Sequence, residues 1–205
     1  VVVNRIVFMA GGIAHAAYGG IGLAYFFQIP YLVGIFGFSL VSSIIMAAIT
    51  LKEKHRADTF IGVLWAVGMA LGVILLDIKE GYNVDLMSYL FGSILTVPFT
   101  ELFIMAGLTV FILLVVGLYY YDFLAMSYDQ EFAQLRGVPV KPLYFLLIAM
   151  IALSVVVVIK VVGLILIIAL LTIPPFIAEK YTHSLFKMMI LSSLLSIMFS
   201  LTGLW

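Results

Sequence analysis

Long apolar runs separated by short polar stretches cover almost the whole chain. The runs are roughly 17 to 22 residues long, close to the ~20 that an α-helix needs to cross a bilayer. Strands of a membrane barrel would be about half as long and would alternate in polarity. The pattern therefore predicts an all-α, polytopic transmembrane bundle of about seven spans. These are expected at residues 6–27, 31–51, 59–76, 101–121, 143–159, 162–179 and 186–204.

The fifth and sixth spans come from one apolar stretch, residues 143–178, which exceeds the ~20 residues of an ordinary crossing. Its only charged residue is Lys160, and Gly163 follows closely, so we expect the chain to reverse there. Pro174 and Pro175 lack backbone donors and are expected to bend or break the sixth helix near its end. The more polar segment 77–100 is not expected to cross, although residues 88–95 are compatible with a short helix at the membrane surface.

The one long polar interruption in the second half of the chain is residues 122–142, called the polar connector below. Residues 127–135 contain helix formers and alternating charge, and Gly137 and Pro139 follow them as a helix end requires. We therefore predict one short amphipathic helix at a membrane surface. Its apolar ridge would consist of Tyr128, Phe132 and Leu135, with charged residues around the rim at Asp129, Glu131 and Arg136.

Composition supports a single transmembrane domain that covers residues 1–205. With 65% hydrophobic residues, 10% charged residues and a mean hydropathy of +1.30, the chain has too much apolar surface for a soluble protein with one core. We expect a multi-pass protein of the cell membrane, in contact with lipid. A formal net charge of zero gives no indication of nucleic-acid binding. The absence of cysteine carries no information about the redox compartment.

The distribution of basic residues predicts the orientation. If the polar connector faces the cytoplasm, all of the ten Lys and Arg except Lys79 and Lys160 lie inside, as the positive-inside rule favours. The basic cluster at residues 52–58 and the polar loop at residues 179–187 then share the cytoplasmic side. Four acidic residues lie on the outer side, where a cation or a docking protein would arrive: Asp77, Glu80, Asp85 and Glu101.

His15 is the candidate functional residue of the first span, because an ionisable side chain within a membrane span often has a function. Gly11 and Gly22 belong to the face on which we expect it, and that face would line a transport pathway. The alternative is a histidine that packs between helices and bonds to a neighbouring carbonyl, because small residues surround it. For the polar connector, the alternative to a partner-binding surface is a solvated loop.

Four short segments of the chain form a recognisable set. The first segment is AHAAYGGIGLA at residues 14–24, and the second is YLFG at residues 89–92. The third has the spacing of Asp129, Glu131, Ala133 and Gly137, and the fourth runs from KVVG to IPP over residues 160–175. In this order, the four segments resemble the integral permease subunit of zinc, manganese and iron ABC importers. The resemblance covers most of the chain. Because family members are usually longer, it also implies a helix before Val1 and one after Trp205.

The resemblance implies separate roles for the permease and its partner proteins. The permease would form the path for a divalent metal cation, which is its substrate, and would hold no tightly bound cofactor. Its partners would be a cytoplasmic ATP-binding subunit, an extracytoplasmic metal-binding protein and a second permease copy. Residues of the polar connector would couple the permease to the ATPase, namely Tyr128, Asp129, Glu131, Phe132, Ala133, Leu135 and Gly137. Relatives commonly pair the histidine with an aspartate four residues earlier, where this chain has Gly11.

Two other function classes remain open from the sequence. An intramembrane hydrolase would use His15 with buried acids, but no HExxH or GxSxG pattern is present. A secondary transporter driven by an ion gradient would normally need an ionisable relay at mid-membrane, and the chain offers none that is clear. Dependence of uptake on a separate ATPase would distinguish the permease from both.

Overall fold

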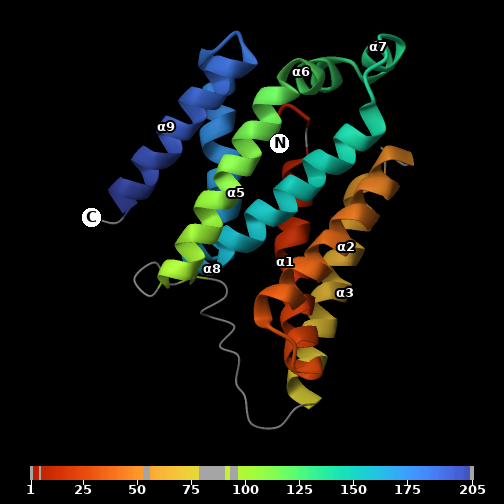
Figure 1. Ribbon diagram of the computed structural model, residues 1–205, viewed down its shortest axis with the longest axis vertical. Helices are drawn as coiled ribbons and strands as arrows, with labels where there is room; N and C mark the ends of the chain where they lie inside the picture. The colour runs from red at the N-terminus through yellow and green to blue at the C-terminus, as the bar shows by residue number, and fades with distance from the viewer. Residues whose placement is uncertain (1, 5, 53–55, 79–90, 93–96, 204–205) are drawn as a thin grey trace.

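The computed structural model describes residues 2–4, 6–52, 56–78, 91–92 and 97–203, apart from the side chain of Lys160 (Figure 1). Within these residues the fold is helical and contains no strand. The element order is α1 (Val7–Phe27), α2 (Tyr31–Lys52), α3 (Ala57–Ile78), α5 (Phe99–Leu118), α6 (Tyr120–Tyr128), α7 (Gln130–Leu135), α8 (Val140–Tyr181) and α9 (Leu185–Gly203). The short helix predicted at residues 88–95 falls largely outside the described residues.

The described residues contain 7 helical stretches long and apolar enough to cross a membrane, which confirms the predicted number of spans. Two of them, Val140–Ile159 and Val161–Tyr181, are the halves of α8. They meet at Gly163, whose φ of 79° and ψ of 167° lie outside the helical region. The reversal predicted at Lys160 and Gly163 is therefore present. A residue with a Cβ would be strained in this backbone conformation, which explains the glycine.

Pro174 and Pro175 were expected to bend or break the sixth span, and they do not break it. Both prolines lie inside α8, and the helix continues to Tyr181. Each proline removes one backbone hydrogen bond, but spanning helices tolerate this loss when neighbouring groups pack around the freed carbonyls. Pro174 is among the fully buried side chains, so it is enclosed in this way.

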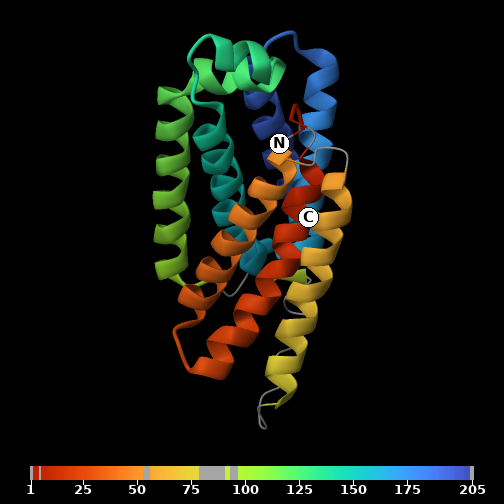
Figure 2. The ribbon, with the colours of Figure 1, turned by 90° about the vertical axis from the view of Figure 1, so that its right-hand side faces the viewer.

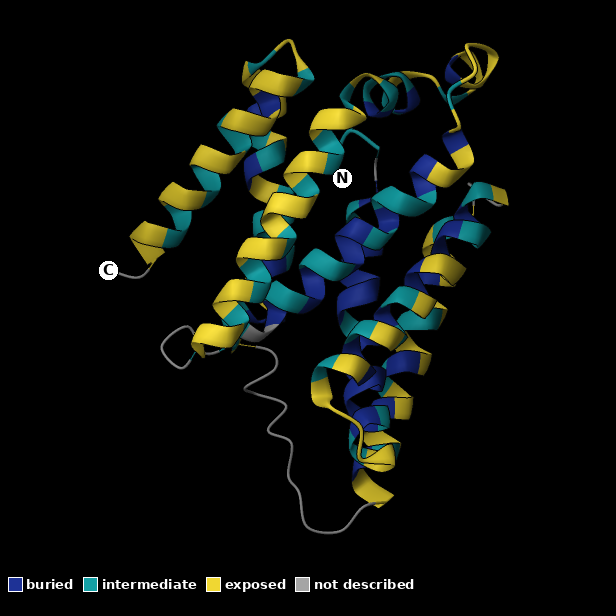
Figure 3. Ribbon diagram, viewed as in Figure 1, coloured by how far each residue is buried: buried dark blue, intermediate teal, exposed yellow. Residues whose placement is uncertain are grey.

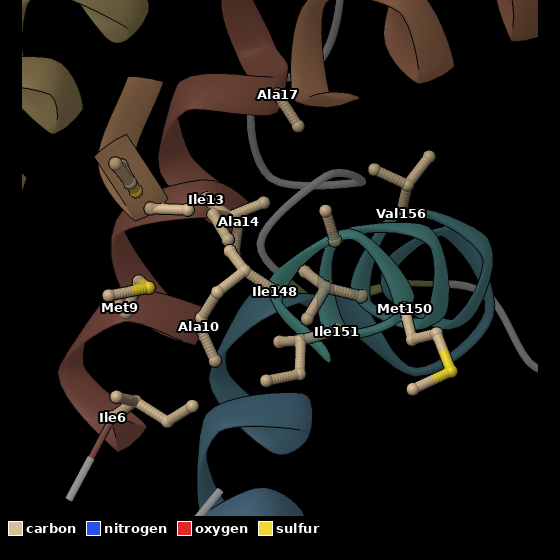
Figure 4. Packing of buried hydrophobic residues seen from close by; sticks show 14 of the residues in the cluster. Ile6, Met9, Ala10, Ile13, Ala14, Ala17, Ile148, Met150, Ile151 and Val156 are labelled. Atoms are coloured by element: carbon tan, nitrogen blue, oxygen red, sulfur yellow. The ribbon is translucent and has the colours of Figure 1, made fainter. Parts of the chain in front are cut away.

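Helix α1 occupies the centre of the bundle and packs against α2, α3 and α8 (Figures 2 and 3). Most of its residues are buried, whereas α5 has none that are. Its many glycines and alanines leave room for neighbouring helices. On the α8 side, Ile148 points toward Ala10 and Ala14 of α1 (Figure 4).

The contact between α1 and α3 is closest at their glycines. A Cβ added to Gly68 would lie 2.7 Å from the Cα of Ala16, and one added to Gly22 would lie 2.8 Å from the Cα of Gly72. Both distances are shorter than any that real Cβ atoms show. The small-residue spacing of Gly68 and Gly72 therefore does allow a second helix backbone to approach closely, as the sequence predicted.

The polar connector is built differently from the prediction. Residues 127–135 do not form one helix, because α6 ends at Tyr128 and α7 begins at Gln130. Asp129 between them has extended backbone, with φ −150° and ψ 107°. The fourth span ends at Leu118 rather than at residue 121, since Tyr119 separates α5 from α6. Tyr128 consequently belongs to a different helix from Phe132 and Leu135.

The ends of the helices divide into two groups. The polar connector, the C-terminal end of α2 and the turn between α8 and α9 lie toward one end of the bundle, near the N-terminus (Figures 1 and 2). The turn between α1 and α2 lies at the other end with the start of α5. This arrangement brings together the basic segments that we assign to the cytoplasmic side.

Cysteine labelling tests this orientation directly, because the natural chain has no cysteine. His183 lies exposed in the turn between α8 and α9, and Thr100 lies exposed at the opposite end. In intact cells, we expect an impermeant thiol reagent to label Thr100→Cys from outside and to label His183→Cys only after the cells are opened. Labelling of His183→Cys in intact cells would reverse the assignment.

Candidate coupling surface and intramembrane histidine

The start of α7 is fixed by the side chain of Asp129. Its Oδ1 accepts hydrogen bonds from the backbone N–H groups of Glu131 and Phe132, both at 3.0 Å. These two groups would otherwise lack partners at a helix N-terminus. The carboxylate also interacts favourably with the positive end of the helix dipole. Asp129 therefore separates α7 from α6 and sets its direction.

The end of α7 is fixed by Gly137. The N–H of Gly137 donates to Gln134 O at 3.1 Å, and the N–H of Val138 donates to Ala133 O at 3.0 Å. This pair of bonds, with Gly137 at φ 84°, is the Schellman arrangement that terminates a helix. Apart from its chain neighbours, no described residue has an atom within 4 Å of a Cβ built on Gly137. Glycine is therefore favoured at this position because of the positive φ angle, and not because neighbouring side chains leave no room for a Cβ.

The two faces of α7 differ sharply. Ala133 is completely buried and belongs to the hydrophobic core cluster, which seats the helix on the bundle. On the outer face, Phe132 is 51% exposed and Leu135 is 86% exposed. Arg136 lies over the ring of Phe132, 5.0 Å from its centroid. Large apolar side chains exposed at a polar end of the molecule are typical of a surface that binds another protein.

The structure places three of the predicted coupling residues away from the outward face of α7. Tyr128 is 73% exposed, but it lies at the end of α6 and extends the apolar surface without sharing a helix with Phe132. Ala133 faces the bundle and not a partner. Asp129 serves as the cap of α7 and not as a residue of its rim. The outward surface thus consists of Phe132 and Leu135, with Tyr128 beside them.

His15 lies half-buried in α1 and stacks on Trp65 of α3. The ring centroids are 4.0 Å apart and the planes differ by 15°. Trp65 donates its indole N–H to the sulfur of Met69 at 3.2 Å, which holds the indole in place. His15 Nδ1 is buried and has no hydrogen-bond partner among the described residues. The bond to a neighbouring carbonyl that would make His15 a simple packing residue is therefore not formed at this nitrogen.

The two glycines expected beside His15 face different helices. Gly11 faces α8, where a Cβ would lie 3.6 Å from Ile168 Cδ1, an ordinary contact distance. Gly22 packs directly on the backbone of Gly72 in α3, so it does not face an open path within the subunit. Within the described part of the chain, no three His, Cys, Asp or Glu side chains are close enough to hold a metal ion together. His15 is thus not part of such a group there.

Sequence reasoning missed Trp65 as the partner of His15. A signal was available, because Trp65, Gly68 and Gly72 repeat at the spacing of one helix face.

Two of the four family-like segments meet in space: a Cβ on Gly92, in YLFG, would lie 2.6 Å from Val161 O at the reversal of α8. The segment around His15 and the polar connector remain separate features of the fold.

Comparisons with known proteins give this geometry a context. The family model described as "ABC 3 transport family" matches residues 1–205. The chain belongs to the ABC 3 transport family. An uncharacterized membrane protein of Synechocystis sp. is 51% identical over 204 residues, with 100% of this chain and 73% of that relative covered. The manganese import system permease protein ScaB of Streptococcus parasanguinis is 35% identical, with 100% and 73% covered.

A solved structure shares the fold of this family member. PsaBC from Streptococcus pneumoniae, solved in complex with Fab, matches with a TM-score of 0.84 and 32% sequence identity. The match covers 100% of this chain and 73% of the other. The protein is accordingly a multi-pass membrane protein of the ABC 3 transport family, a transport subunit and not an enzyme. The intramembrane hydrolase considered from the sequence is set aside.

Proposed function

We propose that this permease imports a divalent metal cation in a cycle driven by a cytoplasmic ATPase. Two copies would enclose the path, because one narrow bundle leaves little room for it and symmetric pairs are the commonest assembly. An extracytoplasmic metal-binding protein would deliver the cation at the end of the bundle that carries the start of α5. The ATPase subunit would bind at the opposite end, on α7.

The observation that carries this proposal is the construction of α7. The helix is held at its start by Asp129 and at its end by Gly137, is seated on the bundle through Ala133, and exposes Phe132 and Leu135. A solvated loop would need none of these features. A helix that is fixed at both ends moves as a rigid unit, so a movement of the partner is passed on to the spans that the helix contacts. A flexible loop would deform and would not pass the movement on. An exposed apolar surface of this kind is suited to binding in a groove of the ATPase subunit.

Manganese is the cargo that the relatives favour, since two ScaB permeases are described as components of manganese import systems. A cation path in this chain would include His15, whose imidazole is a ligand for first-row metals. Because Gly11 supplies no carboxylate, the remaining ligands would come from water, the second copy or the delivering protein. One imidazole in each copy makes a weak site, which suits a pathway that must release its ion.

Substitutions at positions 11 and 15 test the role of His15. A Cβ on Gly11 has ordinary contacts, so Gly11→Asp introduces no backbone clash at its Cβ, and its position is one helical turn from His15. We expect this variant to bind Mn²⁺ about tenfold more tightly or better, because a second ligand of opposite charge is added. His15→Ala is expected to reduce uptake while the protein remains folded. Isotope binding and uptake in cells measure both changes.

The matched control is Gly11→Asn, which has nearly the same shape as Gly11→Asp but no charge. If Gly11→Asp, Gly11→Asn and His15→Ala all bind and transport Mn²⁺ like the natural protein, His15 is a packing residue and the path lies elsewhere.

The decisive experiment for the function is reconstitution. Vesicles that contain the permease and its ATPase are expected to take up Mn²⁺ only when ATP is supplied on the ATPase side. Vesicles with the permease alone and an imposed proton or sodium gradient serve as the comparison. Uptake driven by the gradient without ATPase would identify a secondary transporter and overturn the proposal.

A further inference from the structure

The stack of His15 on Trp65 lies where α1 and α3 are in close contact. Gly68 is one helical turn after Trp65. A Cβ on Gly68 would come within 2.7 Å of the Cα of Ala16, which is the neighbour of His15 in the chain. Because the two backbones cannot come closer, the rings keep a defined separation, with centroids 4.0 Å apart and planes 15° from parallel. The packing of α1 on α3 therefore sets the plane of the imidazole.

Trp65 is itself held by two neighbours. Its indole N–H donates to Met69 Sδ at 3.2 Å, one turn further along α3. The ring of Phe8 lies beside it, with a centroid distance of 6.2 Å. Phe8 precedes His15 by seven residues, which is two turns, so both belong to one face of α1. Trp65 therefore packs along that face and offers the imidazole a fixed surface.

The two ring nitrogens of His15 have different surroundings. Of the two, only Nδ1 is both buried and without a hydrogen-bond partner among the described residues. A cation could not reach Nδ1 without moving packed atoms, so Nε2, at the tip of the ring, is the nitrogen that could act as a ligand. Histidines that bind metals usually donate the other ring N–H to a carbonyl or carboxylate, and this bond fixes the ring. The described part of the chain supplies no such bond at Nδ1.

We propose that Trp65 is the positioning residue of His15, and that its stack replaces the hydrogen bond that normally orients a metal-binding histidine. The terminal torsion of an imidazole has only a broad preference of its own, so an unsupported ring would swing. A ring stacked on the indole keeps one plane. Since Nε2 binds a cation in the plane of the ring, Trp65 determines where the cation must lie. This inference rests on the proposed role of His15 in the cation path.

A stack and a hydrogen bond orient the ring with different consequences for affinity. An acceptor at Nδ1 would also raise the basicity of Nε2 and strengthen its bond to the ion. The face of the indole offers no acceptor in the plane of the imidazole, so it orients the ring without this effect. Trp65 therefore positions the ligand while the site stays weak, as release of the ion on the other side of the membrane requires.

Substitution of Trp65 separates positioning from packing. We expect Trp65→Leu, which is apolar but has no ring, to raise the Mn²⁺ concentration for half-maximal uptake by about tenfold, as loss of an orienting partner typically does. The maximal rate should change less. Trp65→Phe retains a flat ring and should recover most of the affinity. Phe60→Leu removes an exposed ring of the same helix outside the stack, so it is the matched control and should behave like the natural protein.

A double substitution shows whether Trp65 acts through His15. In a His15→Ala background, Trp65→Leu should cause no further rise in the half-maximal concentration, because the ligand that Trp65 orients is already gone. An equal rise in both backgrounds, or a rise with His15→Ala alone, would overturn the inference. A lower maximal rate of Trp65→Leu at an unchanged half-maximal concentration would also overturn it, since that is the result of a packing role.

Fluorescence tests the same contact without transport. The chain has two tryptophans, so Trp205→Phe leaves Trp65 as the sole indole. With this variant alone in lipid nanodiscs, we expect Mn²⁺ to quench the Trp65 emission to saturation, because the paramagnetic ion would bind at the ring that is stacked on the indole. Adding His15→Ala should abolish the saturable quenching.

The two measurements distinguish failure of this inference from failure of the import proposal. Quenching that survives His15→Ala, or the lack of any saturable quenching, would overturn the role of Trp65. Saturable quenching that requires His15, in a permease whose uptake does not depend on the ATPase, would overturn the import cycle and support the positioning role.

Discussion

Replacing Gly72 with leucine should prevent the bundle from assembling. A Cβ at this position would lie 2.6 Å from the backbone oxygen of Tyr18 and 2.8 Å from its carbonyl carbon. Overpacking a core typically costs ~1–3 kcal/mol, and that figure includes relief by side-chain movement. Backbone atoms give no such relief, so α1 and α3 would have to separate along their length. We expect little monodisperse protein after detergent extraction, and a lower melting temperature for whatever remains.

The same helix supplies the control. Gly62 lies ten residues before Gly72 in α3, and outside its own helix turn no described residue has an atom within 4 Å of a Cβ built there. Gly62→Leu therefore introduces the same side chain into the same helix without a clash, and it should express and elute like the natural protein. If Gly72→Leu behaves as well as Gly62→Leu, the close contact of α1 with α3 is not a requirement of the fold.

Truncating Phe132 should separate the permease from its ATPase. The ring is half-exposed on the outer face of α7 while Ala133 behind it is fully buried, so the change removes partner contact and leaves the seat of the helix intact. Central aromatic side chains of protein interfaces cost ~2 kcal/mol or more when truncated, which is about a 30-fold loss of affinity. We expect Phe132→Ala to lose the ATPase subunit on purification and to lose most ATP-driven uptake.

Gln134→Ala is the matched control, because it shortens an exposed side chain of the same helix outside the apolar surface. Gly137→Val provides a second route to the same defect, since it strains the cap that holds α7 in place while meeting no neighbouring atom. Stoichiometric ATPase and normal uptake in Phe132→Ala and Gly137→Val would mean that the polar connector is a solvated loop.

The spans could be predicted from the sequence because each is a long apolar run, and length alone distinguishes a crossing helix. The reversal at Gly163 was also predictable, since one apolar stretch was too long for a single crossing. The division of the polar connector was not predicted, because residues 127–135 are good helix formers. Asp129 nevertheless ends one helix and starts the next, since its carboxylate bonds to two backbone N–H groups that a continuous helix would use internally.

The candidate sites were less predictable than the spans. His15 could be singled out as an ionisable residue at membrane depth, but its stacking on Trp65 depends on the rotation of α3, which no local pattern determines. The side-chain hydrogen bond between Thr50 and Tyr144 joins residues 94 positions apart, and neither residue stands out in its own segment. Contacts between helices of this kind follow from tertiary packing.

The central position of α1 has a consequence for biogenesis. Of the candidate spans, α1 is the least apolar, because glycine and alanine replace the larger aliphatic residues of the others. It also precedes α2, α3 and α8 in the chain, and these are the helices that later bury it. During synthesis, α1 therefore enters the bilayer before the neighbours that make its small-residue surface favourable. Its burial is thus completed only when α2, α3 and α8 have all been made, and a chain interrupted before α3 would leave α1 with α2 as its one packing partner.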